Sequence, residues 1–278
     1  MEMYFFLKVF SLYLRNAPTF AYKITYKIIY SLLFHVLKMR QKTVLTNLRW
    51  AFPDKNEEWY NNTMKQCYKF FTKEFLDFIS FPKNYSSSKI KFKNLEVLSS
   101  AHAMKKGIIL VGSHYGSFDK LFYALSQEEY NLTGVAYKQN NSGADIFFKQ
   151  IRENFMEDQL YKGGDVKQLK NSLVKNNILI LLSDQDAKKK GVQAKFFGID
   201  SSTHSGAAIL SKRNKSPIIY ASITSKNNIY EVEFVKINTS GSINDIVQQY
   251  TSEIEKTIIN NPEQYFWFHK RWKSVKAY

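Results

Sequence analysis

A histidine and an aspartate, His114 and Asp119, stand in the segment of this chain best suited to chemistry. Imidazole is the usual general base near neutral pH, and a carboxylate on its second ring nitrogen fixes the tautomer and stabilises the imidazolium that forms. A short apolar strand is expected at 107–111 and a helix at 117–127. Because active sites in open α/β sheets lie beyond the carboxyl ends of strands, the pattern predicts a catalytic pair rather than a structural histidine.

The same segment offers no protein nucleophile. In a nucleophile elbow of the type G-x-S-x-G, a serine stands midway between two glycines. Here Gly112 and Gly116 are the two glycines, but the residue midway between them is His114. The base must therefore act on a hydroxyl group carried by the substrate. Ser117 is expected to cap the helix that carries Asp119.

Strands and helices are expected to alternate through the rest of the chain. Fully apolar runs such as 178–182 indicate strands buried on both faces, and helices between them favour parallel pairing. The sequence therefore predicts an α/β fold with a mixed, mainly parallel sheet flanked by helices. The expected strands are 107–111, 132–137, 178–182, 217–223 and an edge strand at 230–237, and the expected helices are 57–81, 117–127, 144–155, 166–175, 206–213 and 243–259.

The first 42 residues are apolar but repeatedly interrupted by Lys and Arg. The longest stretch without a charged residue, Ile28 to Leu37, is about half of the roughly 20 residues that a spanning helix needs. The pattern favours two helices lying in a membrane interface, with a helical hairpin packed on the domain or a single span with snorkelling lysines as alternatives. We expect membrane-association helices in 1–42 and the catalytic domain in 43–278.

The charge balance points to an anionic partner. Forty Lys and Arg residues against 24 Asp and Glu residues give a formal net charge of +16. Nucleic acid, phospholipid headgroups and an acidic carrier protein all fit that charge, and composition does not separate them. No helix-turn-helix, zinc or RNA-binding signature supports nucleic acid, which stays a remote alternative. The one cysteine, Cys67, excludes a disulfide within the chain and a thiolate metal cluster.

The pair His114 and Asp119 matches the H-x4-D/E motif of the glycerolipid acyltransferase superfamily. Further blocks, in the same order along the chain, resemble the bacterial lipid A biosynthesis acyltransferases. These blocks are Asn47-Leu48 with Ala51-Phe52-Pro53, then Ser183-Asp184-Gln185-Asp186 with Phe196-Phe197-Gly198, Thr203 and Gly206, then the run from Pro262 to Lys273.

This resemblance implies a glycerol-3-phosphate acyltransferase-like fold and transfer of a fatty acyl chain from acyl–acyl carrier protein to a hydroxyl of a lipid A precursor. The product would be a secondary, acyloxyacyl chain made at the cytoplasmic face of the inner membrane. His114 would be the general base and Asp119 would orient it, with no metal or organic cofactor. The implied partners are acyl carrier protein, anionic inner-membrane lipid and the lipid A precursor, and no nucleic acid. Another glycolipid or glycerophospholipid acceptor is the alternative.

Two cations are candidates for substrate binding near the pair. Many members of this family carry Arg after the second strand, where this chain has Lys138. Lysine neutralises a phosphate or an oxyanion but lacks the bidentate fork of arginine. Arg152 is the candidate for a second cation, and a solvated helix charge is the alternative for both.

Four further residues of the signature blocks are candidates for acceptor binding. Asp184 and Asp186 make a poor metal site without nearby histidine or further acidic residues, so a structural turn or an acceptor-binding role is expected. Arg271 and Lys273 are candidates for contacts with acceptor phosphates. Packing of the C-terminus is the alternative for these two cations.

Overall fold

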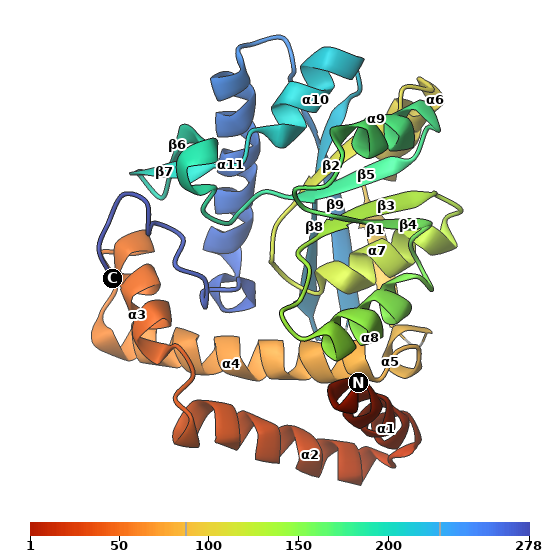
Figure 1. Cartoon of the computed structure of the whole chain (residues 1–278). Helices are drawn as coiled ribbons and strands as arrows, with labels where there is room; N and C mark the ends of the chain where they lie inside the picture. The colour runs from red at the N-terminus through yellow and green to blue at the C-terminus, as the bar shows by residue number, and fades with distance from the viewer. Residues whose placement is uncertain (87, 228) are drawn as a thin grey trace.

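The computed structural model describes residues 1–86, 88–227 and 229–278. Its main feature is a seven-stranded sheet in the order β1-β9-β8-β2-β5-β3-β4, with a separate two-stranded sheet of β6 and β7 (Figure 1). The strands are β1 (Lys89–Lys93), β2 (Ile108–Gly112), β3 (Leu132–Ala136), β4 (Asp158–Tyr161), β5 (Ile178–Leu182), β6 (Val192–Phe196), β7 (Ile199–Thr203), β8 (Ile218–Lys226) and β9 (Ile229–Ile237).

Helices lie on both faces of the large sheet (Figure 1). They are α1 (Glu2–Asn16), α2 (Thr19–Ser31), α3 (Gln41–Ala51), α4 (Glu57–Ile79), α5 (Lys83–Ser86), α6 (Leu95–Ala103), α7 (Phe118–Gln127), α8 (Ser142–Arg152), α9 (Val166–Val174), α10 (Gly206–Asn214) and α11 (Ile243–Asn260), with a π-helical turn η1 (Leu32–Val36) and two 3-10 turns, η2 (Lys188–Lys190) and η3 (Pro262–Gln264).

The central strands are parallel, as the apolar runs predicted. β2 pairs in parallel with β5 and β8, and β3 pairs in parallel with β5 and β4. Alternate residues of β2 face opposite sides, so Ile109 and Val111 enter one hydrophobic cluster with α11 while Ile108 and Leu110 enter another with α7. The expected α/β fold with a mixed, mainly parallel sheet is confirmed.

The expected edge strand at 230–237 is not at an edge. β9 lies between β8, which it pairs antiparallel, and β1, which it pairs in parallel. Its alternating pattern reflects one well-buried face rather than an open edge. The edge next to β9 is β1, whose alternating lysines suit an exposed strand because they discourage pairing with another chain.

The N-terminal helices pack on the rest of the molecule. Leu7 and Leu14 of α1 are buried, and the Ser11 hydroxyl donates to the carbonyl of Ile79 at 2.6 Å. The Tyr22 hydroxyl of α2 donates to the Asp77 carboxylate of α4 at 2.6 Å. Within the described residues, no helix combines the length and the apolar character needed to cross a bilayer.

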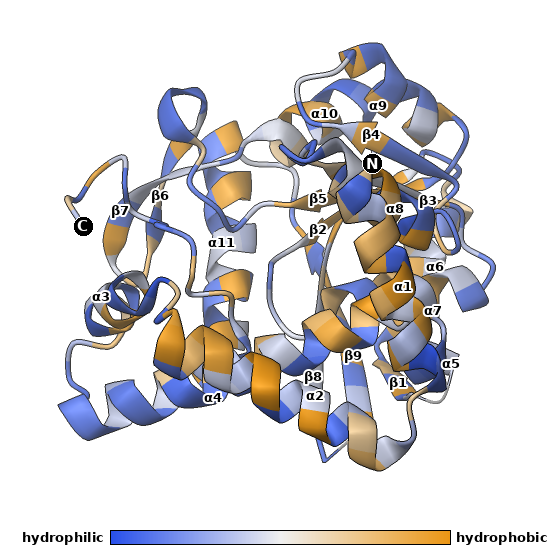
Figure 2. Ribbon diagram, turned by 60° about the horizontal axis from the view of Figure 1, so that its bottom comes forward, coloured by the Kyte–Doolittle hydropathy of each residue, from blue (hydrophilic) through white to orange (hydrophobic). Residues whose placement is uncertain are grey.

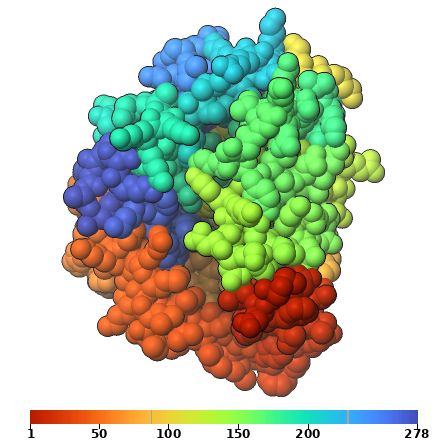
Figure 3. Space-filling view, in the orientation of Figure 1, coloured from red at the N-terminus to blue at the C-terminus, as the bar shows by residue number. Residues whose placement is uncertain are grey.

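The outer side of the N-terminal helices is apolar. Figure 2 turns this side toward the viewer and shows hydrophobic residues along α1 and α2. In the space-filling view the N-terminal segment, in red, lies at the base of the molecule (Figure 3). The exposed large apolar side chains up to residue 39 are Met1, Met3, Phe5, Phe6, Val9, Leu12, Tyr13, Phe20, Ile24, Ile28, Leu32, Val36, Leu37 and Met39.

A buried cluster of charges joins α7 to α4 and β9. Lys120 is only 1% exposed, and its ammonium donates to Asp77 at 2.8 Å, to Glu74 at 3.2 Å and to the Tyr230 hydroxyl at 2.8 Å. Asp77 also accepts from Tyr22, so the cluster reaches α2. Because Lys120 follows Asp119 directly in the chain, this cluster fixes the first turn of the helix that carries Asp119.

Candidate active site

His114 and Asp184 meet at the carboxyl edge of the sheet. β2 and β5 are parallel neighbours with Gly112 opposite Leu182, and each of the two site residues follows its strand at the same offset. The His114 Nδ1 atom lies 2.8 Å from Asp184 Oδ1. Asp184 is almost fully buried, whereas 26% of the His114 side chain is exposed. An ionised carboxylate only accepts, so Nδ1 carries the proton and Nε2 is left unprotonated as a base, with the Gln185 amide nitrogen 3.5 Å away.

The turn after β2 requires a glycine. Gly116 has φ +60°, and a Cβ atom there would lie 1.7 Å from the carbonyl oxygen of Ile223. The C-terminal segment closes over this turn, because the Gly116 amide donates to the Gln264 carbonyl at 2.8 Å and the Phe266 amide donates to the His114 carbonyl at 2.9 Å. The backbone of His114 is therefore held from two sides.

Asp184 determines the charge state of His114. Burial lowers the pKa of His114, but the Asp184 carboxylate outweighs it through its charge and its hydrogen bond, and Asp119 adds to the effect, so the pKa is raised above 6.5. In the same pair, burial raises the pKa of Asp184, and the charge and hydrogen bond of His114 outweigh that effect and keep it low. The arrangement is a base whose imidazolium is stabilised by a buried carboxylate.

Asp119 lies beside this pair without the expected hydrogen bond. In the described part of the chain the ring nitrogen of His114 is bonded by Asp184, not by Asp119. Burial raises the pKa of Asp119 to about 6, against the charges of Arg152 and His114, which lower it. Asp119 therefore acts on His114 through its charge.

Ser117 occupies the N-cap position of α7 but does not cap it through its side chain. The Ser117 side chain is buried, and its Oγ has no hydrogen-bond partner among the described residues. The expected N-cap position is therefore confirmed, but the side-chain hydrogen bond of a cap is absent among the described residues. Buried hydroxyl groups without a partner are uncommon in native structures, so this one needs an explanation.

Two cavities meet at His114, Phe118 and Asp119. The first, here called the sheet-edge cavity, has a volume of about 500 Å³ and is bounded by the ends of β3, β4 and β5 and by α10. Its lining mixes aliphatic side chains with polar ones such as Arg152 and Lys162.

The second cavity, here called the aromatic cavity, has a volume of about 480 Å³. It lies between α4, the start of α7 and the C-terminal segment, and η1 closes part of it. Its lining residues are Leu33, Met39, Tyr68, Phe71, Thr72, Glu74, Phe75, Phe78, Tyr85, His114, Gly116, Ser117, Phe118, Asp119, Phe266 and Phe268.

The two cations expected near the pair are placed differently. Arg152 lines the sheet-edge cavity, donates to the Gln159 side chain at 2.9 Å and lowers the pKa of Asp119 by its charge. Lys138 is exposed and lies outside the lining of both cavities. The structure thus brings Arg152 to the site and leaves Lys138 on the rim.

Arg271 is not available to a phosphate, which corrects the expectation from the sequence. Its side chain is 2% exposed, and its guanidinium donates to the Ser202 carbonyl at 2.9 Å and to the Thr203 hydroxyl at 2.7 Å. The guanidinium also lies over the Phe196 ring. Arg271 therefore fastens the C-terminal segment to the β6–β7 hairpin, which is the packing alternative.

Of the other three acceptor-binding candidates, Asp184 is bonded to His114, and Asp186 and Lys273 differ in their surroundings. The buried Asp186 accepts from the Lys188 amide at 2.9 Å and from the Ser274 hydroxyl at 2.8 Å, so it forms the structural turn. Lys273 is exposed and lies outside both cavity linings. In the described part of the chain, no three His, Cys, Asp or Glu side chains are placed to hold a metal ion.

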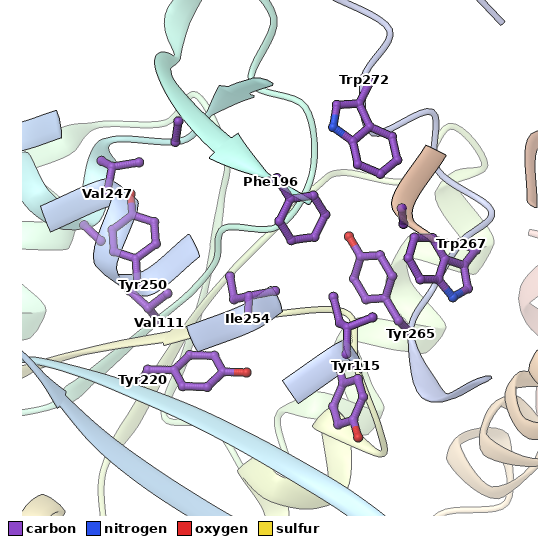
Figure 4. Packing of buried hydrophobic residues seen from close by; sticks show 14 of the residues in the cluster. Val111, Tyr115, Phe196, Tyr220, Val247, Tyr250, Ile254, Tyr265, Trp267 and Trp272 are labelled. Atoms are coloured by element: carbon purple, nitrogen blue, oxygen red, sulfur yellow. The ribbon is translucent and has the colours of Figure 1, made fainter. Parts of the chain in front are cut away.

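Asn47 shows that the signature blocks position the site by packing together. It donates to the carbonyl oxygens of Trp267 and His269 at 2.7 and 2.8 Å. Figure 4 shows Tyr265, Trp267 and Trp272 beside Phe196 in the core next to the turn at Tyr115. The blocks therefore build the framework that holds the C-terminal segment over His114.

The sequence did not reveal that Asp184 is the partner of His114. A signal in the sequence could have revealed this pairing. Two buried apolar runs, 108–112 and 178–182, are each followed two residues later by a polar residue, His114 and Asp184, that is suited to chemistry. Parallel neighbours place such residues side by side. Glu74, which lines the aromatic cavity from α4, was also missed, because nothing in the local pattern of that helix marks it.

Comparison with known proteins gives a match along nearly the whole chain. A family model described as bacterial lipid A biosynthesis acyltransferase matches residues 2–274. Two curated proteins are similar to the chain, the lipid A biosynthesis palmitoleoyltransferase of Escherichia coli (strain K12) and the lipid A biosynthesis acyltransferase of Shigella flexneri. Each is 24% identical over 190 residues, a match that spans 66% of this chain and 61% of the relative's own length.

Replacing Arg271 tests its structural role. We expect Arg271→Ala to lower the free energy of unfolding by about 2–4 kcal/mol, since it leaves buried acceptors and a void behind. Lys273→Ala, at an exposed site, should stay within about 0.5 kcal/mol of the parent. Denaturant unfolding of both variants measures this. An Arg271→Ala protein of unchanged stability would contradict the assignment.

Proposed function

Because the chain belongs to the bacterial lipid A biosynthesis acyltransferase family, we propose that it transfers a fatty acyl chain from acyl–acyl carrier protein to a hydroxyl of a lipid A precursor. The observation that carries the proposal is a histidine base, bonded to a buried carboxylate, at the junction of two largely apolar cavities. Among the described residues, His114 bonds with Asp184 and Gln185 and with no Ser, Thr or Cys side chain. A hydroxyl of the substrate is therefore the natural proton donor to Nε2.

The transfer proceeds by direct attack. His114 Nε2 takes the proton of the acceptor hydroxyl as its oxygen attacks the thioester carbonyl carbon, and a C–O bond forms. The tetrahedral intermediate collapses by breaking the C–S bond, and the imidazolium returns the proton to the departing thiolate of the carrier. Asp184 holds Nδ1–H and stabilises the imidazolium between the two steps.

Charge around the pair supports both steps. Asp119 is ionised above about pH 6 and adds a second negative charge near the imidazolium, while Arg152 favours the ionised form of Asp119. Backbone amides at the start of α7 are suited to the oxyanion, because a helix N-terminus carries partial positive charge. Lys138 is less suited to this role since it lies outside both cavities.

The protein is proposed to work at the cytoplasmic face of the inner membrane. The exposed face of α1 and α2 combines apolar side chains with Lys8, Lys23 and Lys27. This combination fits the interface of an anionic bilayer. The formal net charge of +16 also favours association with an acidic carrier protein.

The catalytic assignment is tested by removing each member of the motif. His114→Ala should lower acyl transfer by roughly 10²–10⁴-fold, the usual contribution of a positioned general base. Asp119→Ala should also lower the rate severely. The loss in the double variant should be smaller than the product of the two single losses, because the effects of groups that act on one proton transfer are not additive. Transfer from acyl–acyl carrier protein to a lipid A precursor is the measurement.

A second readout separates direct attack from a covalent intermediate. Intact-protein mass spectrometry of enzyme mixed with the carrier-bound donor alone should find no acyl adduct. A stable acyl adduct on a serine or on Cys67 that turnover requires would refute direct attack and establish a ping-pong mechanism.

The pH profile tests the role of Asp184. His114 must be neutral to accept a proton, and its pKa is raised, so kcat/KM should fall as pH decreases through a value above 6.5. Asp184→Asn removes the stabilising charge, so the acidic limb should move to lower pH while the maximal rate drops. Asp186→Asn is the matched control and should leave the limb in place. An unmoved limb in Asp184→Asn would contradict the pairing.

Membrane association is tested on the exposed face of α2. A variant combining Phe20→Glu, Ile24→Glu and Ile28→Glu places charge where the interface would lie and should reduce sedimentation with anionic vesicles. The control combines Val166→Glu and Val174→Glu on α9, two similarly exposed apolar positions, and should bind as the parent does. Equal binding of both variants would exclude α2 as the membrane surface.

A further inference from the structure

The aromatic cavity has the character of a site for hydrocarbon. Aromatic and aliphatic side chains of α4, η1 and the C-terminal segment form most of its wall. Among the described residues of its wall, the one with a full charge away from the His114 end is Glu74, whose carboxylate is held by Lys120 at 3.2 Å and by Lys73 at 3.6 Å. The charge of Glu74 is therefore already neutralised inside the protein. An alkyl chain fits this wall better than a sugar or a phosphate does.

The proposed reaction needs two hydrocarbon sites at one histidine. A secondary acylation joins an incoming acyl chain to a hydroxyl that is itself carried on an acyl chain. The remainder of that hydroxyacyl chain must continue past His114 into an apolar space that the incoming chain does not use. The two cavities that meet at His114, Phe118 and Asp119 supply two such spaces.

We propose that the aromatic cavity binds the alkyl tail of the acceptor's hydroxyacyl chain, and that Ser117 donates a hydrogen bond to the polar group next to the reacting hydroxyl. This proposal rests on the proposed function and assigns a substrate to one cavity of that same site. The sheet-edge cavity is then left for the chain of the carrier-bound donor.

The position of the aromatic cavity decides between the two chains. Leu33 and Met39 form part of its wall, and they belong to the segment whose neighbours Leu32, Val36 and Leu37 are exposed and apolar. A lipid held at that surface reaches the cavity without crossing water. The sheet-edge cavity is bounded instead by a polar loop from Lys162 to Asp165. This loop leads from β4 to α9, and α9 lies far from α2 (Figure 1). A donor delivered from solution by a carrier protein reaches that side.

Ser117 gives the second, independent observation. It lines the aromatic cavity and not the sheet-edge cavity, and its buried Oγ has no partner among the described residues. A hydroxyl without a partner in an apolar wall is unfavourable until a ligand supplies an acceptor. The carbonyl that links a hydroxyacyl chain to its sugar is such an acceptor. The thioester carbonyl of the donor is another, so the choice between the two chains rests on the position of the cavity. Ser117 thus selects a chain with a polar group at the His114 end of the cavity.

The test narrows the cavity at its rim. Leu33→Trp adds volume inside the aromatic cavity, and Ile259→Trp adds the same volume at an exposed position of α11, outside both cavities and the N-terminal surface, as the matched control. Acceptors are N-(3-hydroxyacyl)-glucosamine phosphates with long or short hydroxyacyl chains, each assayed with carrier-bound donors of several lengths. Leu33→Trp should lower kcat/KM for the long acceptor by roughly tenfold or more and spare the short one. Donor-length preference should stay that of the parent, as should every parameter of Ile259→Trp.

Ser117→Ala tests the polar contact. It should lower kcat/KM for long and short acceptors alike by roughly tenfold, the loss expected for one hydrogen bond, with an unchanged pH profile. A shift of donor-length preference in Leu33→Trp, with acceptor preference intact, would overturn the assignment. Unchanged acceptor preference in Leu33→Trp would overturn it too, as would an unchanged kcat/KM in Ser117→Ala.

A binding readout separates failure of this site from failure of the proposed function. A 3-hydroxyacyl-glucosamine phosphate with a diazirine at the end of its chain is photolysed with the full-length protein in detergent, and mass spectrometry locates the adduct. Labelling at Phe71 or Phe75 supports the site even if no acyl transfer is detected with that acceptor. Labelling at Leu160 or Leu210, or no specific labelling, overturns it.

Discussion

The whole site depends on the parallel pairing of β2 with β5. That register places His114 and Asp184 side by side although 70 residues separate them in the sequence. The strand period of two means that a slip by one residue would turn the His114 side chain to the other face of the sheet and break the 2.8 Å bond. Residues on both faces of β2 are buried, so such a slip would also move apolar side chains out of both hydrophobic clusters. Core packing therefore enforces the catalytic geometry.

A second constraint joins the site to the N-terminal surface. One buried hydrogen-bonded cluster links α7, α4, β9 and α2. These elements contribute Lys120, Asp77, Tyr230 and Tyr22, respectively. Removing one partner of a buried ion pair usually costs about 3–5 kcal/mol because the other charge is left without compensation. The helix that carries Asp119 and the apolar base of the molecule therefore behave as one unit. The proposed membrane surface on α1 and α2 and the catalytic residue His114 are therefore held by the same set of buried contacts.

The sequence predicted much of the fold but little of the site beyond one motif. Buried strands such as β2 and β5 are recognisable because covered faces demand continuous apolar runs. Alternation in β9 indicates one covered face, which does not distinguish an edge from an interior position, and the lysines of β1 hid the real edge. Arg271 and Asp184 show why side-chain roles were harder to predict. Arg271 is buried, and Asp184 is paired with His114, by contacts with segments far apart in the chain.

Two carboxylates around one imidazole have separate physical tasks. Asp184 is nearly inaccessible and hydrogen-bonded to His114, which keeps the pKa of Asp184 low, and its bond fixes the ring. Asp119 makes no such bond in the described chain, and burial raises its pKa to about 6. Hydrocarbon in both cavities would replace water around Asp119 and His114 and strengthen every charge interaction between them. The imidazolium formed during transfer is then stabilised most when both substrates are present, which ties proton transfer to occupancy of the two cavities.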